Sequence, residues 1–250
     1  MQVTHWDLAL LQAINEWLAS SQERFLIALN ISDRWPWIII ACSFCGLWFA
    51  GTSSLLAKHP GGIVRMIARR YLIQVCLLFP MLFILARLVQ QPVSHVRPLA
   101  LEGILDIPLP PRVWEPVVHS LQVQGSFPSD HAVVFGMMIV LMARIRTAFA
   151  VVALLVSTAL LLLRVGLGFH WPSDVIAGLG LGMGTTWLMT SPRSMRVMSG
   201  VHRRVLDFES MRPRIFYLVA LVFLIDLSQK FAILSSMMSA GSRLLGGSGT

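Results

Sequence analysis

The chain has 250 residues, of which 56% are hydrophobic and only 13% are charged, and its mean hydropathy is +0.71. Soluble globular domains carry about 25% charged residues, so this composition excludes an ordinary soluble domain and indicates an integral membrane protein. The formal net charge of +8 comes mostly from arginine. Because these arginines occur in short segments between apolar runs, they indicate membrane orientation signals rather than nucleic-acid binding.

The first expected element is an amphipathic helix over residues 4–19, with Thr4 and Asp7 as a capping pair at its start. Its apolar face carries two tryptophans and consists of Trp6, Leu10, Ile14 and Trp17. Such a face is typical of a helix that lies in the membrane interface, although a helix packed against a bundle gives the same pattern. We assign residues 1–34 to this interfacial region.

Six apolar runs follow, and we expect each to cross the bilayer, which takes about 20 residues. They cover residues 35–57, 63–89, 129–144, 147–164, 172–190 and 215–235. A proline-rich loop is expected over residues 90–127, and a small, polar, disordered tail over residues 241–250. The predicted fold is an all-α integral membrane protein with one domain over residues 1–240. It comprises about six transmembrane helices in one bundle plus the N-terminal interfacial helix.

Basic residues define the expected orientation, since cytoplasmic loops carry an excess of lysine and arginine. They gather after the first, third and fifth spans: Lys58, Arg65, Arg69, Arg70, Arg144, Arg146, Arg193, Arg196, Arg203, Arg204, Arg212 and Arg214. This side is therefore predicted to be cytoplasmic, with the arginines near residue 65 snorkelling to the headgroups. The loop over residues 90–127 and both chain termini then lie on the opposite side, which is the periplasmic face of a bacterial inner membrane.

The three cysteines, Cys42, Cys45 and Cys76, all lie inside apolar runs. Cys42 and Cys45 form a C-x-x-C pair, but no second pair exists and no histidine is near in sequence. A lone pair is a weak signal for metal or redox chemistry. We interpret all three as small buried hydrophobic residues.

Two short stretches concentrate polar side chains at the edges of apolar runs. The first, residues 127–131, reads FPSDH, and Ser129 there is a good helix N-cap whose neighbouring backbone amides favour an anion. The second, residues 164–174, reads RVGLGFHWPSD. Its spacing lets the Asp174 carboxylate hold one imidazole nitrogen of His170 while the other nitrogen faces a substrate. These residue types at a membrane edge indicate chemistry on the phosphate of a lipid.

The stretches resemble the motifs of the type 2 phosphatidic acid phosphatase superfamily, which read K-x6-R-P, P-S-G-H and S-R-x5-H-x3-D. Arg97 and Pro98 match the end of the first motif, residues 128–131 the second, and residues 164–174 the third. Three positions differ from the family pattern: Gln90 stands in place of lysine, Asp130 in place of glycine and Leu163 in place of serine. Arg87, one helical turn before Gln90, is a candidate substitute for the missing lysine.

The chain looks most like bacterial undecaprenyl pyrophosphate phosphatases, through its P-S-D-H variant, and is also similar to the lipid A phosphotransferase branch. The resemblance implies that His170 attacks phosphorus and forms a phosphohistidine, and that Asp174 fixes its tautomer. His131 would protonate the leaving oxygen and then activate water. The implied phosphate-binding positions are Arg97, Arg164, Ser129, Asp130 and Gln90. No metal or other cofactor is expected, because arginines neutralise the phosphate charge.

Other interpretations remain open for several of these residues. Ser129 is nearly as well explained as a plain helix cap, and Arg97 and Arg164 as snorkelling anchors at the membrane edge. The carboxylate of Asp130 would repel a phosphate unless it points away from the site. The histidines outside the motifs are interpreted as solvated, surface or interface residues: His5, His59, His95, His119 and His202.

The implied function is removal of the terminal phosphate of undecaprenyl pyrophosphate at the periplasmic face, which recycles the carrier lipid for peptidoglycan synthesis. Transfer of the phosphate to lipid A is one alternative, and hydrolysis of phosphatidylglycerophosphate or phosphatidic acid is another. A non-catalytic lipid-binding protein on a degenerate scaffold is a fourth possibility. The expected partners are a lipid phosphate or pyrophosphate and membrane lipids, without nucleic acid, and the oligomeric state is open.

Overall fold

The structure, a computed structural model, describes residues 4–49, 61–90, 95–122 and 125–228. Every regular element in these ranges is a helix. The elements are α1 (His5–Ala19), α2 (Gln22–Phe49), α3 (Gly61–Gln90), the short 3-10 helix η2 (Pro98–Ala100), α4 (Pro111–Gln122), α5 (Asp130–Ile145), α6 (Thr147–Gly166), α7 (Pro172–Met189), α8 (Pro192–Val197), α9 (Ser199–Met211) and α10 (Pro213–Ser228). The predicted all-α fold is thus confirmed for the described residues, whereas the predicted tail over residues 241–250 lies outside them.

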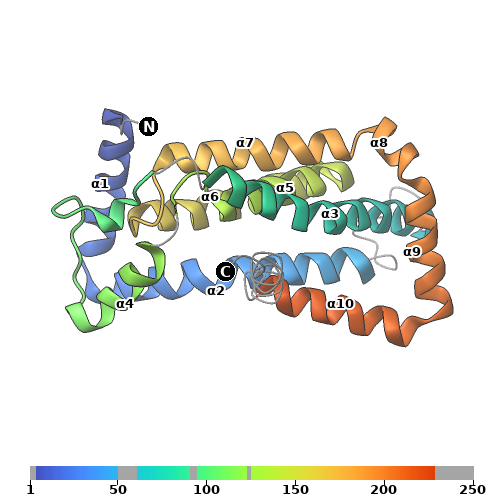
Figure 1. Cartoon of the computed structure of the whole chain (residues 1–250), viewed down its shortest axis with the longest axis horizontal. Helices are drawn as coiled ribbons and strands as arrows, with labels where there is room; N and C mark the ends of the chain where they lie inside the picture. Colours follow the sequence, from blue (N-terminus) through green and yellow to red (C-terminus); the bar gives the residue numbers. More distant parts are fainter. Residues whose placement is uncertain (1–3, 50–60, 91–94, 123–124, 229–250) are drawn as a thin grey trace, which may run out of the picture.

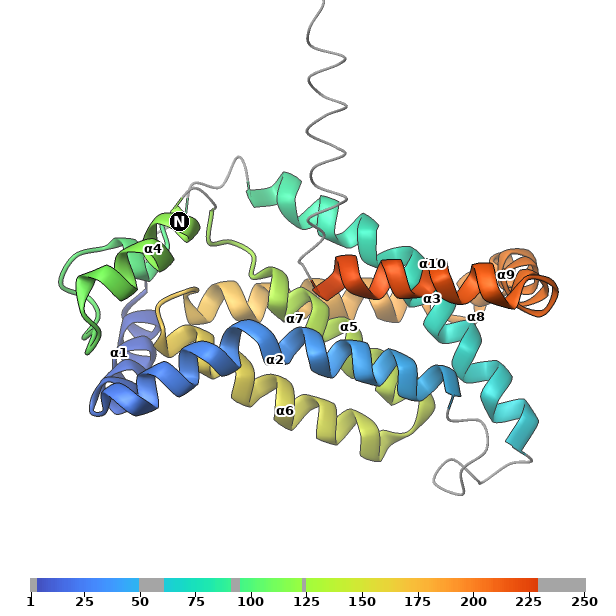
Figure 2. The ribbon, with the colours of Figure 1, turned by 90° about the horizontal axis from the view of Figure 1, so that it is seen from below.

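The helices form an elongated bundle. Helices α2, α5, α6, α7 and α10 run roughly along its long axis (Figure 1), whereas α3 crosses the bundle obliquely (Figure 2). Helices α1 and α4 lie at one end, and α8 and α9 lie at the other, as Figure 2 also shows. The connection between α5 and α6 lies toward the α8–α9 end. The second and third motifs lie at the starts of α5 and α7, and both of these starts face the α1–α4 end.

Helix α5 occupies the centre of the bundle. Residues 131–141 are all buried, as expected of a helix that is apolar on every side. Its backbone approaches that of α7 closely, because a Cβ atom added at Gly182 would lie only 2.0 Å from the carbonyl oxygen of Val133. Small residues permit such contact between membrane helices. The contact fixes the start of α5, with the second motif, relative to the start of α7, with the third.

Three helical segments in the described residues are long and apolar enough to cross a membrane: Gln22–Phe49, Met66–Ala86 and Thr147–Gly166. The other predicted spans correspond to shorter helices, since α5 and α10 have 16 residues each, or to the glycine-rich α7. The structure therefore supports a membrane protein and three of the six expected crossings. The bounds of α3, α5, α6 and α7 agree with the predicted runs to within about two residues.

The boundary between the predicted interfacial region and the first predicted span is wrong. Helix α2 begins at Gln22 and continues through the polar residues Asp33 and Arg34, which lie before the predicted start of the span at residue 35. Within this part of α2, Ser32 is fully buried and accepts hydrogen bonds from Arg164 through its carbonyl and hydroxyl oxygens, which satisfies its polar groups inside the bundle.

The segment predicted as a proline-rich loop contains a helix, α4. Pro111 stands at its first position, where a residue without an N–H costs no hydrogen bond. Trp114 on this helix is buried and packs edge-on against Phe25 of α2, with ring centroids 5.6 Å apart. The prolines of this segment therefore do not prevent part of it from forming a helix.

Residues His5–Ala19 form a helix, α1, within the range predicted for the N-terminal helix, but its capping differs from the prediction. The Thr4 hydroxyl donates to Asp7 at 2.7 Å instead of capping the helix backbone. Asp7, almost fully buried, accepts a hydrogen bond from the backbone N–H of Ser173 at the start of α7. Asn15 of α1 donates to the carbonyl oxygen of Gly166 at 3.0 Å. These bonds attach α1 to the bundle through a side that also buries Leu11 and Leu18. Of the predicted apolar face, Trp6, Leu10 and Trp17 are exposed, and Ile14 packs against the core. The location of α1 in the membrane interface stays a prediction.

At the opposite end, two further expectations are wrong. Arg69 is buried rather than snorkelling, because its guanidinium donates to Glu209 of α9, with Nη1 3.2 Å from Oε2, and to the carbonyl oxygen of Trp48. His202 is also buried, and its Nε2 atom lies 2.8 Å from Oε1 of Gln74 on α3. Polar partners on neighbouring helices make both burials favourable.

The cysteines are less buried than predicted. Cys42 and Cys45 are exposed on α2, and Cys76 on α3 is half-buried; all three are free thiols. In a membrane-spanning helix, an exposed position faces lipid, and a small apolar residue is compatible with that environment.

Candidate active site

The structure gathers the motif residues at the α1–α4 end of the bundle. His131 and Asp130 start α5, Arg164 ends α6, and Asp174 starts α7. Six of the predicted site residues are at most 4% exposed: Arg97, Ser129, His131, Arg164, His170 and Asp174. The side chains of Gln90 and Arg87 lie outside the described residues, so the roles considered for them stay predictions.

Tight packing of two backbone segments brings Arg97 to His170. The turn after α6 passes through Gly168, whose φ of +72° favours glycine. The carbonyl oxygen of Gly168 accepts from the backbone N–H of Leu99 at 3.0 Å, which ties the turn to the segment with η2. The indole of Trp171 donates to the carbonyl oxygen of Val96 at 2.9 Å. Loop residues distant in sequence are therefore held beside the third motif.

His170 is oriented by a backbone carbonyl. Its Nδ1 atom lies 2.9 Å from the carbonyl oxygen of Ser126, which only accepts hydrogen bonds, so Nδ1 carries the proton. The lone pair of Nε2 then faces Nη1 of Arg97, 3.4 Å away. Burial, followed by the positive charges of Arg97 and Arg164, holds the pKa of His170 well below its usual value. His170 is therefore neutral near pH 7, as a nucleophile must be.

The predicted direct contact between Asp174 and His170 does not form. The Oδ1 atom of Asp174 lies 3.0 Å from Nδ1 of His95, and Oδ2 accepts from the hydroxyl of Ser126 at 2.5 Å and from the backbone N–H of Trp171 at 2.9 Å. The reason is local: the carboxylate folds back to cap the start of α7. Asp174 is linked to His170 through Ser126, which bonds both residues.

Two residues of this cluster were missed by the sequence analysis. His95 is only 6% exposed, so its interpretation as a solvated loop residue is wrong, whereas His119 is exposed as expected. Ser126 is fully buried and contacts both Asp174 and His170. The only sequence signal for either is proximity, since His95 precedes Arg97 by two positions and Ser126 precedes the second motif.

Asp130 points into the site, between the two histidines. Its Oδ1 atom lies 3.1 Å from Nδ1 of His131, accepts from the backbone N–H of His131 at 3.0 Å, and lies 4.0 Å from Nε2 of His170. The His131 ring packs edge-on against Trp37, with ring centroids 5.0 Å apart. The hydroxyl of Ser129 accepts from the N–H of Ala132, so the expected cap of α5 is present.

The two arginines are buried and do not snorkel. Arg97 donates from Nη1 to the carbonyl oxygen of Phe169 at 2.7 Å and from Nη2 to that of Gly125 at 3.2 Å. Arg164 donates to Ser32, and its guanidinium lies 5.1 Å from the ring centroid of Phe169. The buried Nε atom of Arg164 has no hydrogen-bond partner among the described residues. Arg164 therefore offers a donor to a bound anion.

A neutral histidine beside two buried arginines, with a second histidine held by a carboxylate, is a site suited to phosphoryl transfer. The site lies in a chain whose described residues form only helices, three of them long and apolar enough to cross a membrane. Residues 103–198 match the family model described as the PAP2 superfamily. This stretch holds the second and third motifs, whereas Gln90 and Arg97 precede it.

Members of the PAP2 superfamily are phosphatases, and the match indicates a phosphatase-type activity on a phosphorylated lipid or small molecule. Comparisons with curated proteins and with solved structures gave no significant match.

Proposed function

We propose that the protein is a lipid phosphatase that removes the terminal phosphate of undecaprenyl pyrophosphate at the periplasmic face of a bacterial inner membrane. The observation that carries the proposal is the arrangement of His170, whose neutral Nε2 atom faces Arg97 while His131 stands across the Asp130 carboxylate. The choice of substrate rests on the resemblance of residues 128–131 to the P-S-D-H variant.

In the first step, Nε2 of His170 attacks the terminal phosphorus and forms a P–N bond. The bond from phosphorus to the bridging oxygen breaks, and undecaprenyl phosphate leaves. His131, protonated on Nε2, gives its proton to that oxygen. Arg97 and Arg164 neutralise the charge that spreads over the phosphoryl oxygens in the transition state. General acid catalysis of this kind contributes about a hundred- to ten-thousand-fold.

In the second step, neutral His131 accepts a proton from water as the water oxygen attacks the phosphohistidine. The P–N bond breaks, inorganic phosphate is released and His170 returns to its neutral form. The Ser126 carbonyl keeps the proton of His170 on Nδ1 throughout, and Asp174 positions Ser126. Asp130 accepts from Nδ1 of His131, which keeps Nε2 as the nitrogen that transfers the proton.

Charge distribution supports the periplasmic assignment. The basic connection after α5 and the basic helices α8 and α9 lie at the end of the bundle opposite the histidines (Figures 1 and 2). Cytoplasmic segments of membrane proteins carry such an excess of arginine. A site at the other end is accessible to a carrier lipid that has delivered its cargo outside the cell, so the product re-enters peptidoglycan synthesis.

The test is phosphate release from undecaprenyl pyrophosphate in detergent with EDTA, by the wild type and by His170→Ala. We expect release by the wild type and loss of at least a thousand-fold in the variant. Acid-labile, base-stable phosphate on the wild-type protein after a rapid quench would identify the phosphohistidine. Release that survives His170→Ala would contradict the mechanism, and labelled phosphate that appears on added lipid A would identify a phosphotransferase instead.

A further inference from the structure

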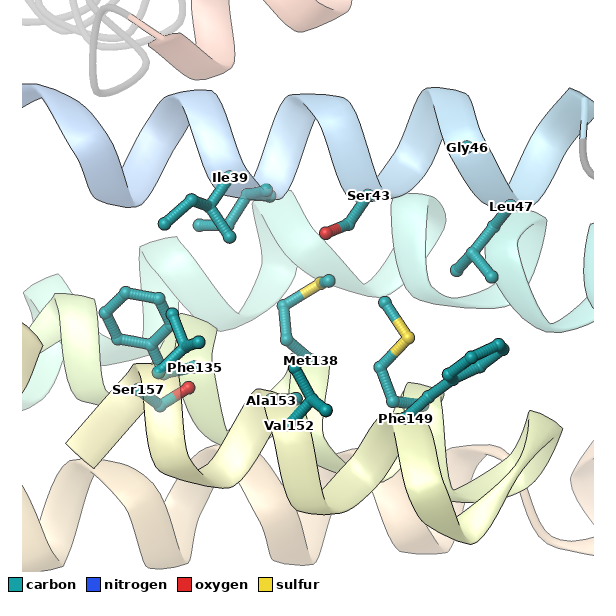
Figure 3. Close-up of a pocket in the computed structure, with 13 residues that line it drawn as sticks. Ile39, Ser43, Gly46, Leu47, Phe135, Met138, Phe149, Val152, Ala153 and Ser157 are labelled. Atoms are coloured by element: carbon teal, nitrogen blue, oxygen red, sulfur yellow. The ribbon is translucent and has the colours of Figure 1, made fainter. Parts of the chain in front are cut away.

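An apolar groove runs along the bundle between α2 and α6, with α5 as its floor (Figure 3). Its volume is about 510 Å³, within the range of roughly 300–1,000 Å³ that is usual for small-molecule sites. The side chains that line it are almost all apolar, and Ser43 and Ser157 are the polar exceptions among them. Two methionines of α5, Met138 and Met142, lie along it and supply flexible, adaptable contacts.

The groove begins where the candidate active site ends. Its floor starts at Phe135, one helical turn or about 6 Å along α5 from His131. Its α6 wall starts at Ser157, two turns before Arg164. Its α2 wall starts at Ile39, just after Trp37, whose ring packs on His131. With increasing distance from the histidines, the groove residues come after His131 on α5, after Arg164 on α6, and after Trp37, the neighbour of His131, on α2.

The length and direction of the groove suit a hydrocarbon chain. From Phe149 to Ser157 the α6 wall extends for about 12 Å, at 1.5 Å per residue. Helices α2 and α6 are candidate membrane spans, so the groove opens toward lipid in the bilayer. A charged headgroup would lose its solvation in such a groove, whereas an apolar chain gains from burial there.

We propose that the groove binds the part of the substrate's hydrocarbon chain that is nearest to the phosphate, and that the lipid enters the site sideways between α2 and α6. This inference rests on the proposed lipid phosphatase function and adds the position of the chain. The chain contacts then orient the terminal phosphorus toward His170, because the groove and the histidines lie on the same three helices.

A second apolar cavity, of about 670 Å³, does not have this relation to the site. It is lined by residues of α2, α3, α9 and α10, including Trp48, Leu72 and Phe216. Helix α9 lies at the opposite end of the bundle (Figure 2). This cavity therefore serves as a reference: lipid that merely fills apolar surface would occupy both.

The test compares a long and a short substrate. Ala153 lines the groove on α6, and Ala159 on the same helix is exposed but does not line it. We expect Ala153→Phe to raise KM for undecaprenyl pyrophosphate at least ten-fold and to leave hydrolysis of dimethylallyl pyrophosphate unchanged, since a five-carbon chain does not reach Ala153. Ala159→Phe should change neither. Ser43→Phe, on the α2 wall, should reproduce the effect of Ala153→Phe.

The outcomes separate the two proposals. Equal KM values for Ala153→Phe and Ala159→Phe on the long lipid would overturn the groove inference and leave the proposed function intact. A wild type that hydrolyses neither pyrophosphate would overturn the proposed function and, with it, the inference. Photocrosslinking of a diazirine-bearing polyprenyl pyrophosphate to His170→Ala gives an independent readout without turnover. Labelling of α2 and α6 peptides is expected, and labelling of α9 and α10 alone would contradict the inference.

Discussion

The carboxylate of Asp130 points toward the place where a phosphate would bind, although like charges repel. Its Oδ1 atom holds Nδ1 of His131 at 3.1 Å and lies 4.0 Å from Nε2 of His170. A carboxylate only accepts hydrogen bonds when ionised, so Asp130 is a poor phosphate ligand. Its contacts suit a positioning residue that selects the tautomer of His131, and Arg164 lies close enough to balance its charge electrostatically.

We therefore expect Asp130→Ala to lower kcat for phosphate release about ten- to a hundred-fold, because His131 loses the acceptor that fixes its proton on Nδ1. Asp130→Asn should retain more activity than Asp130→Ala, since its amide oxygen still accepts from His131. Steady-state kinetics with separate kcat and KM values checks this expectation. An Asp130→Ala enzyme with raised kcat and lowered KM would show instead that the carboxylate only repels the substrate.

The charge of Arg97 influences the expected pH dependence of kcat/KM. After burial, its positive charge is the largest influence that lowers the pKa of His170. The attacking form of His170 is neutral and predominates above its pKa, so the acidic limb of kcat/KM in the wild type should lie well below pH 6.5. Arg97→Gln should raise the pKa of His170 and shift this limb of the residual activity to higher pH.

The charge-conserving variant Arg97→Lys is the matched control. It should leave the acidic limb near its wild-type position even where the rate falls, because an ammonium group still disfavours protonation of His170. If the pH–rate profiles of Arg97→Gln and Arg97→Lys coincide, the positive charge of Arg97 does not control the pKa of His170.

At this scale the sequence predicted which residues meet but not how they bond. The motifs predicted that His131, His170, Arg97 and Arg164 share one site. In the structure all four are buried, and Nη1 of Arg97 lies 3.4 Å from Nε2 of His170, whereas their roles stay predictions. The partner of Asp174 could not be predicted, because spacing along a chain limits distance but not the direction of a side chain. A capping bond to Trp171 turns the carboxylate toward His95, a residue with no motif of its own.

Between elements, the contact of α5 with α7 sets the geometry of the site. We expect Gly182→Ala to lower the melting temperature and the activity together, because its Cβ would lie 2.0 Å from the carbonyl oxygen of Val133 and the helices must separate. Overpacking of this kind typically costs about 1–3 kcal/mol. The matched control is Gly180→Ala, where an added Cβ meets nothing within 4 Å.

Thermal unfolding in detergent and phosphate release measure the two effects. Gly180→Ala should match the wild type in both assays. Equal melting temperatures for Gly182→Ala and Gly180→Ala would mean that the α5–α7 contact does not limit stability.

Element boundaries were predictable where an apolar run is bounded by charges or turns, as for α6 and α7. They were not predictable where tertiary partners satisfy polar side chains. The first half of α2 contains several polar residues, yet it is helical, and Ser32 there accepts a hydrogen bond from Arg164, a residue 132 positions later. Likewise, Pro111 and Pro116 indicated a loop, but α4 forms because Pro111 occupies a permitted first position and Trp114 packs against Phe25.

Over the whole molecule, composition and charge patterning predicted the class of protein and the separation of its two ends. The basic helices α8 and α9 lie opposite the histidines, as the distribution of arginines along the chain required. The buried ion pair of Arg69 with Glu209 and the bond of His202 with Gln74 were not predictable. Both interactions join α3 to α9. Hydrophobic patterning identifies each helix separately and does not show which helices contact each other.

Helix α1 has a consequence for the order of events during synthesis. Its Asp7 and Asn15 bond residues that follow them by 166 and 151 positions. At about 5–20 residues per second, the first helix therefore waits roughly ten to thirty seconds for its partners to leave the ribosome. The end of the bundle that contains the histidines closes only once α7 has begun to emerge, so the nascent protein acquires a complete site late, shortly before α8 and α9 complete the opposite end.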